Sequence, residues 1–324
     1  MNTLRTGVVG VGHMGINHAR VYSELKDSQL TAVYDADPGV AQSVARKYKT
    51  HAAATLEEFA SLVDAATICT PTTTHYEIGK YLLEQGKHLL IEKPIADTPE
   101  AARGLSELAA QKSCVLQVGH IERFNPVLAA LEQKLQNPRF LEVTRLSPFP
   151  NRSTDVGVVL DLMIHDIEII LHLVNSPVVS MDPVGIAVLS KGEDIANVRF
   201  HFANGCVANV TASRISRDKV RKIRVFQENA YLSLDYQKQD GVMFRLVEGK
   251  KGKEIVRENV EVQRGEPLMI ELESFVRCAR EGAKPKVSGG QAADALDIAL
   301  EITRRIQEAD PRKNAAAAAA LATS

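Results

Sequence analysis

Short apolar runs alternate with helical repeats along the first 120 residues of the chain. Strand–helix–strand repeats of this kind are typical of a parallel, doubly wound sheet. The pattern therefore predicts an α/β domain of the Rossmann type over residues 1–121. The expected strands are residues 7–10, 30–34, 65–69, 88–91 and 115–118, with helices over 13–26, 38–48 and 75–85.

A different pattern follows after residue 121. One long helix is expected over 156–175, and six strand candidates with alternating apolar and polar residues lie between 194 and 262. Asn204-Gly205 favours a hairpin turn, and such alternation is typical of antiparallel strands with one face on a core. With helices at 267–281 and 290–308, residues 122–310 predict an α+β domain with a large, open, mostly antiparallel sheet.

Composition and charge narrow the function classes. The 324 residues carry 39 Lys and Arg against 40 Asp and Glu, a balance that does not suit a protein that coats nucleic acid. No apolar run approaches the roughly 18–20 residues that span a bilayer, and no cleavable signal peptide is visible. Residues 311–324, in which Asn314 precedes six alanines, are a low-complexity tail to which we assign no function.

The four cysteines lie far apart in the sequence, in apolar surroundings, and no two form a Cys-x-x-Cys pair. We expect free thiols in a reducing cytoplasm, and neither a disulfide framework nor a structural metal site.

Gly10-Val11-Gly12-His13-Met14-Gly15 is a G-x-G-x-x-G motif between the first expected strand and helix. In that context Gly10 permits the tight turn, Gly12 the approach of a pyrophosphate, and Gly15 close helix packing. Without the context, the glycines would indicate an ordinary turn.

Asp35 ends the second expected strand, 20 residues after Gly15. Its carboxylate suits the ribose hydroxyls of NAD and repels the 2′-phosphate of NADP. Residues 36–39 contain no arginine, so the sequence favours NAD; the alternative is a simple turn residue.

Two further groups carry candidate chemistry. Glu92-Lys93-Pro94 follows a strand at the edge where open α/β sheets bind ligands, although the tripeptide alone also fits a surface turn. Asp161 and His165 stand four residues apart on one helix, and a carboxylate beside an imidazole suits a general base. The pair also fits half of a metal site, or a polar stripe that faces solvent and continues through Glu168 and His172.

Together these motifs resemble the glucose–fructose oxidoreductase / inositol dehydrogenase / MocA family of oxidoreductases over about residues 3–308. The resemblance implies a Rossmann domain, then an α+β domain often used for oligomerisation. It implies proton transfer by Lys93 and His165 with Asp161 beside them, and a cofactor loop at Thr70, Pro71 and His75.

This chain departs from the family in the run before Asp161. Many members have a glycine-rich run there, whereas the run that begins at Asp155 here is not rich in glycine. The floor of the substrate pocket is therefore expected to differ.

Segments 120–126, 160–166 and 211–217 resemble the family members that oxidise the 3-hydroxyl of UDP-N-acetylglucosamine, before an aminotransferase in the route to amide-linked lipid A. The resemblance implies a nucleotide-sugar substrate, with Arg123 and Asn125 as candidates for holding the sugar. A dehydrogenase of a free polyol such as inositol, and a nonenzymatic NAD-binding regulator, are the alternatives.

Six basic residues lie among the eleven from Arg214 to Arg224. A charged, soluble sheet edge would explain them. The functional hypothesis is that Arg214 or Arg217 holds the diphosphate of a nucleotide sugar, because an arginine fork donates two hydrogen bonds to phosphate oxygens. The broad sheet predicts a homodimer or homotetramer.

Overall fold

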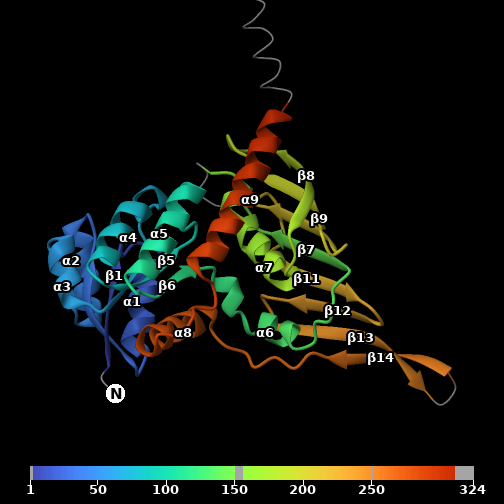
Figure 1. Cartoon of the computed structure of the whole chain (residues 1–324), viewed down its shortest axis with the longest axis horizontal. Coiled ribbons are helices and arrows are strands. Elements are labelled where there is room, and N and C mark those ends of the chain that lie inside the picture. Colours follow the sequence, from blue (N-terminus) through green and yellow to red (C-terminus); the bar gives the residue numbers. More distant parts are fainter. Residues whose placement is uncertain (1–2, 150–155, 250–251, 311–324) are drawn as a thin grey trace, which may run out of the picture. The chain divides into compact units, whose positions relative to one another are not determined.

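The computed structural model describes residues 3–149, 156–249 and 252–310, and its contacts divide the chain into two compact units (Figure 1). The first unit holds the residues up to Phe124 together with Gly265–Leu296. The second holds Asn125–Arg264 and the residues from Asp297 on. The expected tail 311–324 and Asp155 lie outside the described residues.

This division corrects the expected continuous second domain, because residues 265–296 return to the first unit. The reason is apolar packing: Leu268, Leu272 and Phe275 are buried in one core cluster with Val21 and Tyr22. Burial of the apolar face of this helix is favourable, so the segment packs with the first unit although it follows the second unit in the sequence.

The first unit contains a six-stranded parallel sheet of order β3-β2-β1-β4-β5-β6, which confirms the predicted doubly wound architecture. Its strands are β1 (Leu4–Val9), β2 (Ser28–Tyr34), β3 (His51–Ala52), β4 (Ala65–Ile68), β5 (His88–Glu92) and β6 (Leu116–Gly119). Its helices are α1 (Gly15–Glu24), α2 (Pro38–Tyr48), α3 (Leu56–Leu62), α4 (His75–Glu84), α5 (Pro99–Gln111) and α8 (Pro267–Glu281), with short 3₁₀ turns η1 (Thr72–Thr74) and η2 (Ile121–Phe124).

Local sequence signals set the helix starts in this unit. Asp37, Thr55 and Thr98 accept hydrogen bonds from backbone N–H groups in the first turns of α2, α3 and α5. Pro38 and Pro99 occupy the first helical positions, where their missing N–H groups are not needed.

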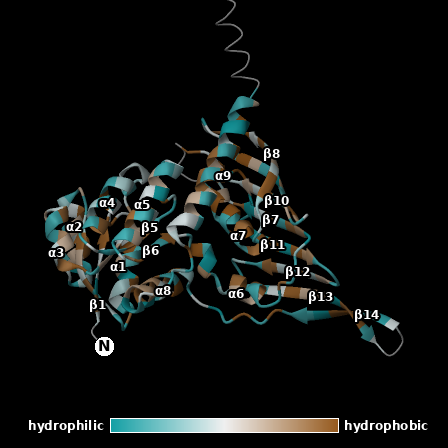
Figure 2. Ribbon diagram, in the orientation of Figure 1, coloured by the Kyte–Doolittle hydropathy of each residue, from teal (hydrophilic) through white to brown (hydrophobic). Residues whose placement is uncertain are grey.

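The second unit contains an eight-stranded sheet of order β14-β13-β12-β11-β7-β10-β9-β8, in which only β7 and β10 pair in parallel. This confirms the large, mostly antiparallel sheet, and Figure 2 shows the alternation of hydrophobic and hydrophilic residues along its strands. The strands are β7 (Phe140–Leu146), β8 (Val178–Ile186), β9 (Ile195–Phe202), β10 (Val207–Ser213), β11 (Val220–Gln227), β12 (Ala230–Asp235), β13 (Asp240–Gly249) and β14 (Gly252–Asn259).

Two of these strands, β7 and β8, were not predicted. In β7, Arg145 occupies an inward position. Its side chain is buried there and forms an ion pair with Asp166. β8 contains Pro183 and Gly185 and lies at the edge of the sheet, the place where strands tolerate both residues.

The helices of this unit are α6 (Pro126–Glu132), the π turn η3 (Val159–Met163) and α7 (Ile164–Val174), and α9 (Gly289–Glu308) spans the division between the units. The single helix expected over 156–175 is therefore shorter and begins with a π turn, which α7 continues. Within the described ranges, no helix is long and apolar enough to cross a membrane.

Candidate active site

The G-x-G-x-x-G motif forms a tight turn between β1 and α1. Gly10 has a φ of +80°, and a Cβ there would lie 2.9 Å from the Thr70 nitrogen. A Cβ on Gly15 would lie 1.9 Å from the Gly10 oxygen, so α1 packs directly on the turn. A Cβ on Gly12 would meet nothing within 4 Å, and exposed His13 and Met14 follow it. This open backbone before a helix N-terminus fits a pyrophosphate.

Asp35 is held against this turn. Its Oδ2 accepts a hydrogen bond of 2.8 Å from the Val11 nitrogen, and its Oδ1 accepts one of 3.0 Å from the Asp37 nitrogen. The carboxylate is thus fixed at the end of β2, where it fits the ribose hydroxyls of NAD.

The loop after β4 lies next to the glycine turn. Thr74 Oγ1 donates a hydrogen bond to Thr70 Oγ1 at 2.7 Å, and exposed Pro71 lies between these threonines in the chain. The buried ring nitrogens of His75 lie 2.8 Å from the Thr70 carbonyl and 2.9 Å from the Pro94 carbonyl. Burial lowers the pKa of His75, against the effect of these two carbonyls. His75 therefore joins two loops of the site, and we expect its effect on a cofactor to be indirect.

Lys93 follows β5 at the same carboxyl edge of the sheet and precedes a cis peptide bond to Pro94. The preceding Glu92 accepts a hydrogen bond of 3.2 Å from the Lys93 nitrogen. The first unit thus places the glycine turn, the Thr70 loop and Lys93 at one edge of its sheet, which is where such sheets bind ligands.

Sequence reasoning did not single out His120. Glu92 and Gly119 are partners in the β5–β6 pair, so Lys93 and His120 leave the sheet side by side. Burial, with the positive charges of Lys93 and Arg123, lowers the pKa of His120 to about 3. Its imidazole is therefore neutral at neutral pH. The position immediately after an apolar strand was the signal that could have identified it.

In the second unit, Asp161 lies in the π turn and His165 in the first turn of α7. Both are half-buried, whereas Met163 and Ile164 between them are buried. Both side chains are therefore more accessible than the two residues immediately before His165.

The polar stripe expected to continue from this pair faces solvent only in part, because His172 is partly exposed and Glu168 is not. Glu168 is buried, and a ring nitrogen of His172 lies 2.9 Å from Glu132 Oε1. Buried Asp166 accepts hydrogen bonds of 2.7 and 2.8 Å from the Arg145 guanidinium. Because Arg145 and Asp166 bind each other through two hydrogen bonds, few of their polar atoms are left for a ligand.

Among the predicted phosphate ligands, Arg214 differs most from the expectation. Its side chain has no exposed area, and its guanidinium donates to Asp194 Oδ1 at 2.9 Å, Ser190 Oγ at 2.7 Å and the Val156 carbonyl at 2.7 Å. The structure therefore does not support Arg214 as a diphosphate ligand.

Asp194 explains why Arg214 is buried. Its Oδ2 also accepts hydrogen bonds from the nitrogens of Val188, Leu189 and Ser190. Burial alone would raise the pKa of Asp194, but hydrogen bonds led by that of Ser190 hold it below the usual range. The charge on Asp194 is thus retained, and Arg214 balances it.

The other substrate candidates have different surroundings. Asn125 begins α6, where its Oδ1 accepts from the Val127 nitrogen at 3.2 Å and its Nδ2 donates to the Tyr236 carbonyl at 3.1 Å. This capping role makes a sugar contact less suitable for its amide. Arg123 is buried in η2, whereas Arg217 is exposed in the loop before β11. Arg217 is therefore the more accessible candidate for binding phosphate.

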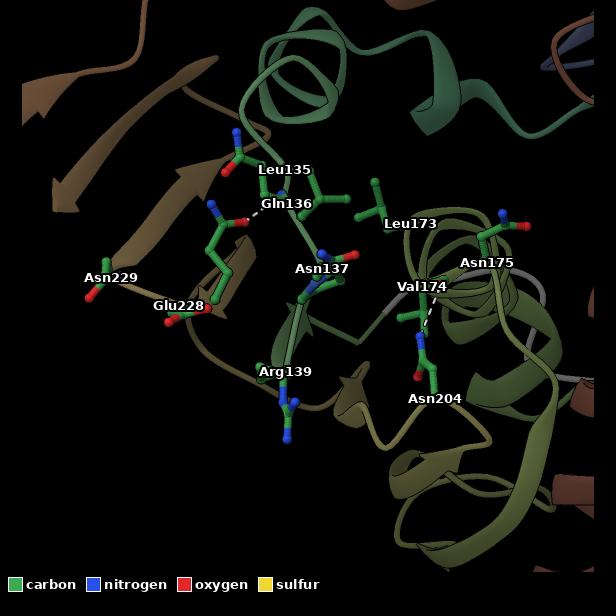
Figure 3. Close-up of a pocket in the computed structure, with 12 residues that line it drawn as sticks. Leu135, Gln136, Asn137, Arg139, Leu173, Val174, Asn175, Asn204, Glu228 and Asn229 are labelled. Atoms are coloured by element: carbon green, nitrogen blue, oxygen red, sulfur yellow. Dashed lines mark hydrogen bonds between the residues drawn. The ribbon is translucent and has the colours of Figure 1, made fainter.

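The second unit also contains a polar hollow of about 1080 Å³, shown in Figure 3. None of the predicted site residues lines it. Asn137, Asn175 and Asn229 lie on its wall with φ values of 46°, 47° and 59°. Asparagine tolerates this left-handed conformation, so turn geometry explains these residues and we assign the hollow no function.

Cys69, Cys114, Cys206 and Cys278 are all free thiols. Cys206 and Cys278 are buried, and the other two are partly buried.

Comparisons with known proteins identify the family of the chain. The model of the NAD-binding Rossmann fold of the GFO/IDH/MocA oxidoreductases matches residues 4–120, and that of a GFO/IDH/MocA C-terminal domain matches residues 132–233. The chain is 37% identical to the UDP-N-acetylglucosamine 3-dehydrogenase of Acidithiobacillus ferrooxidans, over 92% of this chain and 96% of that one.

A crystal form of that enzyme superposes with a TM-score of 0.89 at 33% identity, over 95% of this chain and 99% of that one. The inositol 2-dehydrogenase of Rhizobium meliloti is 26% identical over 94% of this chain and 98% of its own. The same fold occurs in a levoglucosan dehydrogenase bound to NADH, with 18% identity, a TM-score of 0.85, and coverage of 95% and 98%. The chain therefore belongs to the GFO/IDH/MocA family of NAD-dependent oxidoreductases.

Proposed function

We propose that this protein oxidises the 3-hydroxyl of UDP-N-acetylglucosamine to a ketone, with NAD as hydride acceptor. The observation that carries the proposal is the 37% identity to an enzyme of that name over nearly all of both chains. The product would be a keto sugar suited to an aminotransferase, as in the route to amide-linked lipid A, and we place the reaction in the cytoplasm.

The proposed chemistry assigns one task to each group. Bound NAD would supply the acceptor for the hydride that leaves the sugar carbon. His165 accepts the proton of the hydroxyl, and Asp161 raises the basicity of its ring. Lys93 stabilises the negative charge that develops on the oxygen. The glycine turn and Asp35 hold the pyrophosphate and ribose of the cofactor.

A substrate panel tests the proposal. NADH formation is followed by absorbance with UDP-N-acetylglucosamine, free N-acetylglucosamine and inositol at equal concentrations. We expect turnover of the nucleotide sugar alone. Turnover of inositol instead would favour the free-polyol alternative, for which the 26% identity to an inositol 2-dehydrogenase is the supporting observation.

We also propose that the second sheet forms a homodimer or homotetramer. Phe140, Phe226, Tyr231 and Phe244 follow one another across β7, β11, β12 and β13, with ring centroids 5.5, 4.8 and 5.8 Å apart. They alternate with buried core residues and are only half-buried themselves.

An aromatic row of this kind suits a protein partner. Light scattering at micromolar concentration should give a dimer or tetramer, and Tyr231→Glu should shift it toward the monomer. A wild-type monomer would refute the proposed assembly.

A further inference from the structure

A buried group of ionisable side chains lies next to Lys93 within the first unit, and the chemistry proposed above does not use it. His18 in α1 and Glu271 in α8 have no exposed area. His18 Nε2 lies 3.0 Å from Glu92 Oε1, and the Glu92 side chain is 12% exposed. A ring nitrogen of His18, the Cys69 sulfur and a Glu92 oxygen all lie within 4.8 Å of one another.

Glu92 is held on three sides. His18 contacts Oε1, and the Lys93 nitrogen donates to Oε2. A Cβ on Gly119 in the adjacent strand would lie 2.9 Å from the Glu92 carboxyl carbon, so the carboxyl group packs directly on that glycine. Movement of the Glu92 carboxyl group would therefore be transmitted to the backbone of Lys93.

Glu271 has the opposite surroundings. Neither of its carboxyl oxygens has a hydrogen-bond partner among the described residues. The Gln117 side chain binds only the Glu271 backbone carbonyl, at 3.2 Å. A carboxylate buried without donors is strongly disfavoured. Burial, and then the charge on Glu92, raise the pKa of Glu271 well above its ordinary value.

Two ionisable groups near Glu271, Tyr22 and Cys69, do not supply a compensating charge. Burial raises the pKa of both Tyr22 and Cys69, and Glu271 itself contributes to each shift. Both groups are therefore neutral at neutral pH. His18 is the nearby base, and its Nε2 contacts Glu92 Oε1.

We propose that Glu92 and Glu271 hold one proton between them, on Glu271, and that Glu271 is thereby a positioning residue for Lys93. While Glu271 is neutral, Glu92 is the single carboxylate and keeps its contacts with His18 and the Lys93 backbone. If Glu271 lost its proton, two negative charges would repel each other in a buried site, and Glu92 would be displaced. The effect on Lys93 rests on the function proposed above; the shared proton does not.

The shared proton is tested by unfolding in urea at pH 5, 6, 7 and 8. Above about pH 4.3, the ordinary pKa of glutamate, the folded chain holds one more proton than the unfolded chain. Stability of the wild type should therefore fall as pH rises, by up to about tenfold in the unfolding equilibrium constant per pH unit.

Glu271→Gln cannot ionise, so its stability should not share this fall, and its advantage over the wild type should grow with pH. Glu273→Gln is the matched control, because Glu273 is exposed on the same helix. It should follow the wild type. Parallel pH dependences of wild type and Glu271→Gln would overturn the proposal.

Coupling between the two carboxyl groups is tested with Glu92→Gln, which keeps an acceptor for the Lys93 nitrogen but removes the charge. Without the charge on residue 92, the pKa of Glu271 should be lower. The fall in stability with rising pH should therefore end at least about one pH unit lower than in the wild type. An unchanged range would show that the two groups do not share a proton.

The effect on Lys93 is tested by the pH profile of NAD-dependent turnover. Glu271→Gln should retain the KM of the wild type and keep its kcat to higher pH. A change in kcat and KM by the same factor at every pH would indicate a merely structural role. Because unfolding needs no substrate, failure of the shared proton and failure of the proposed reaction are distinguishable.

Discussion

The two units of this protein bury charge in different ways. In the second unit, the Arg145–Asp166 and Arg214–Asp194 pairs have closely matched donors and acceptors. In the first unit, no group in the described part of the chain donates a hydrogen bond to the buried Glu271 carboxyl group, which lies next to the residues that hold Lys93. Satisfied buried pairs stabilise a fold, whereas poorly satisfied titratable groups gather where chemistry occurs. The comparison separates charges that maintain structure from charges that we expect to affect the reaction.

The largest expected effect concerns the catalytic candidates. Lys93→Met and His165→Ala should each reduce kcat by about 10²–10⁴-fold, the usual contribution of a general acid or base. Because neither residue belongs to the glycine turn, binding of NAD, measured by calorimetry, should change little. If both variants retain the wild-type rate of the chemical step, the catalytic roles are wrong.

Arg214 and Arg217 should respond differently to substitution. Arg214→Met should destabilise the protein by about 3–5 kcal/mol in urea unfolding, because it leaves Asp194 as a buried, unpaired charge. Arg217→Ala should leave stability nearly unchanged, since that side chain is exposed, and should raise the KM for UDP-N-acetylglucosamine. An unchanged KM would remove the case for phosphate binding at Arg217.

Asp35→Ala should reduce the preference for NAD over NADP by about 10–100-fold. The change removes hydrogen bonds to a charged acceptor, each of which contributes about 1.5–3 kcal/mol, together with the repulsion of a 2′-phosphate. Dissociation constants of both cofactors measure the effect. Equal affinities in the wild type would contradict the assigned role of Asp35.

His120 gives the smallest effect, and its sign follows from its lowered pKa of about 3. Below about pH 6.5 the unfolded chain binds a proton at this histidine and the folded chain does not. Stability should therefore fall as pH decreases from 6.5 toward 3, by at most about 1.4 kcal/mol per pH unit. His120→Gln should lose less stability over this range, as measured by thermal unfolding at pH 6.5, 5.5 and 4.5. Identical acid sensitivity would show that His120 is not held neutral.

Local sequence patterns were sufficient to predict much of the fold of this protein. The parallel sheet, the glycine turn and the helix starts at Asp37, Thr55 and Thr98 depend on neighbouring residues. Their physical causes, which are strand burial, backbone freedom and capping, act over a few positions. The strand alternation likewise indicated most of the second sheet.

The burial and pairing of charged side chains depended on tertiary packing and could not be predicted from local patterns. Arg214 and Arg217 belong to one basic run, yet the first is buried by Asp194, twenty residues away, and the second is exposed. Arg145 turns inward in β7 only because Asp166 lies in the helix that covers it.

Glu271 lies far along the chain from Glu92, and α8 joins the first unit because its apolar face packs on α1. Sequence periodicity shows which face of an element is buried but not which distant charge will meet it. Pairing between distant residues depends on how the elements pack, and that packing decides which charged groups maintain the fold and which are left close to Lys93.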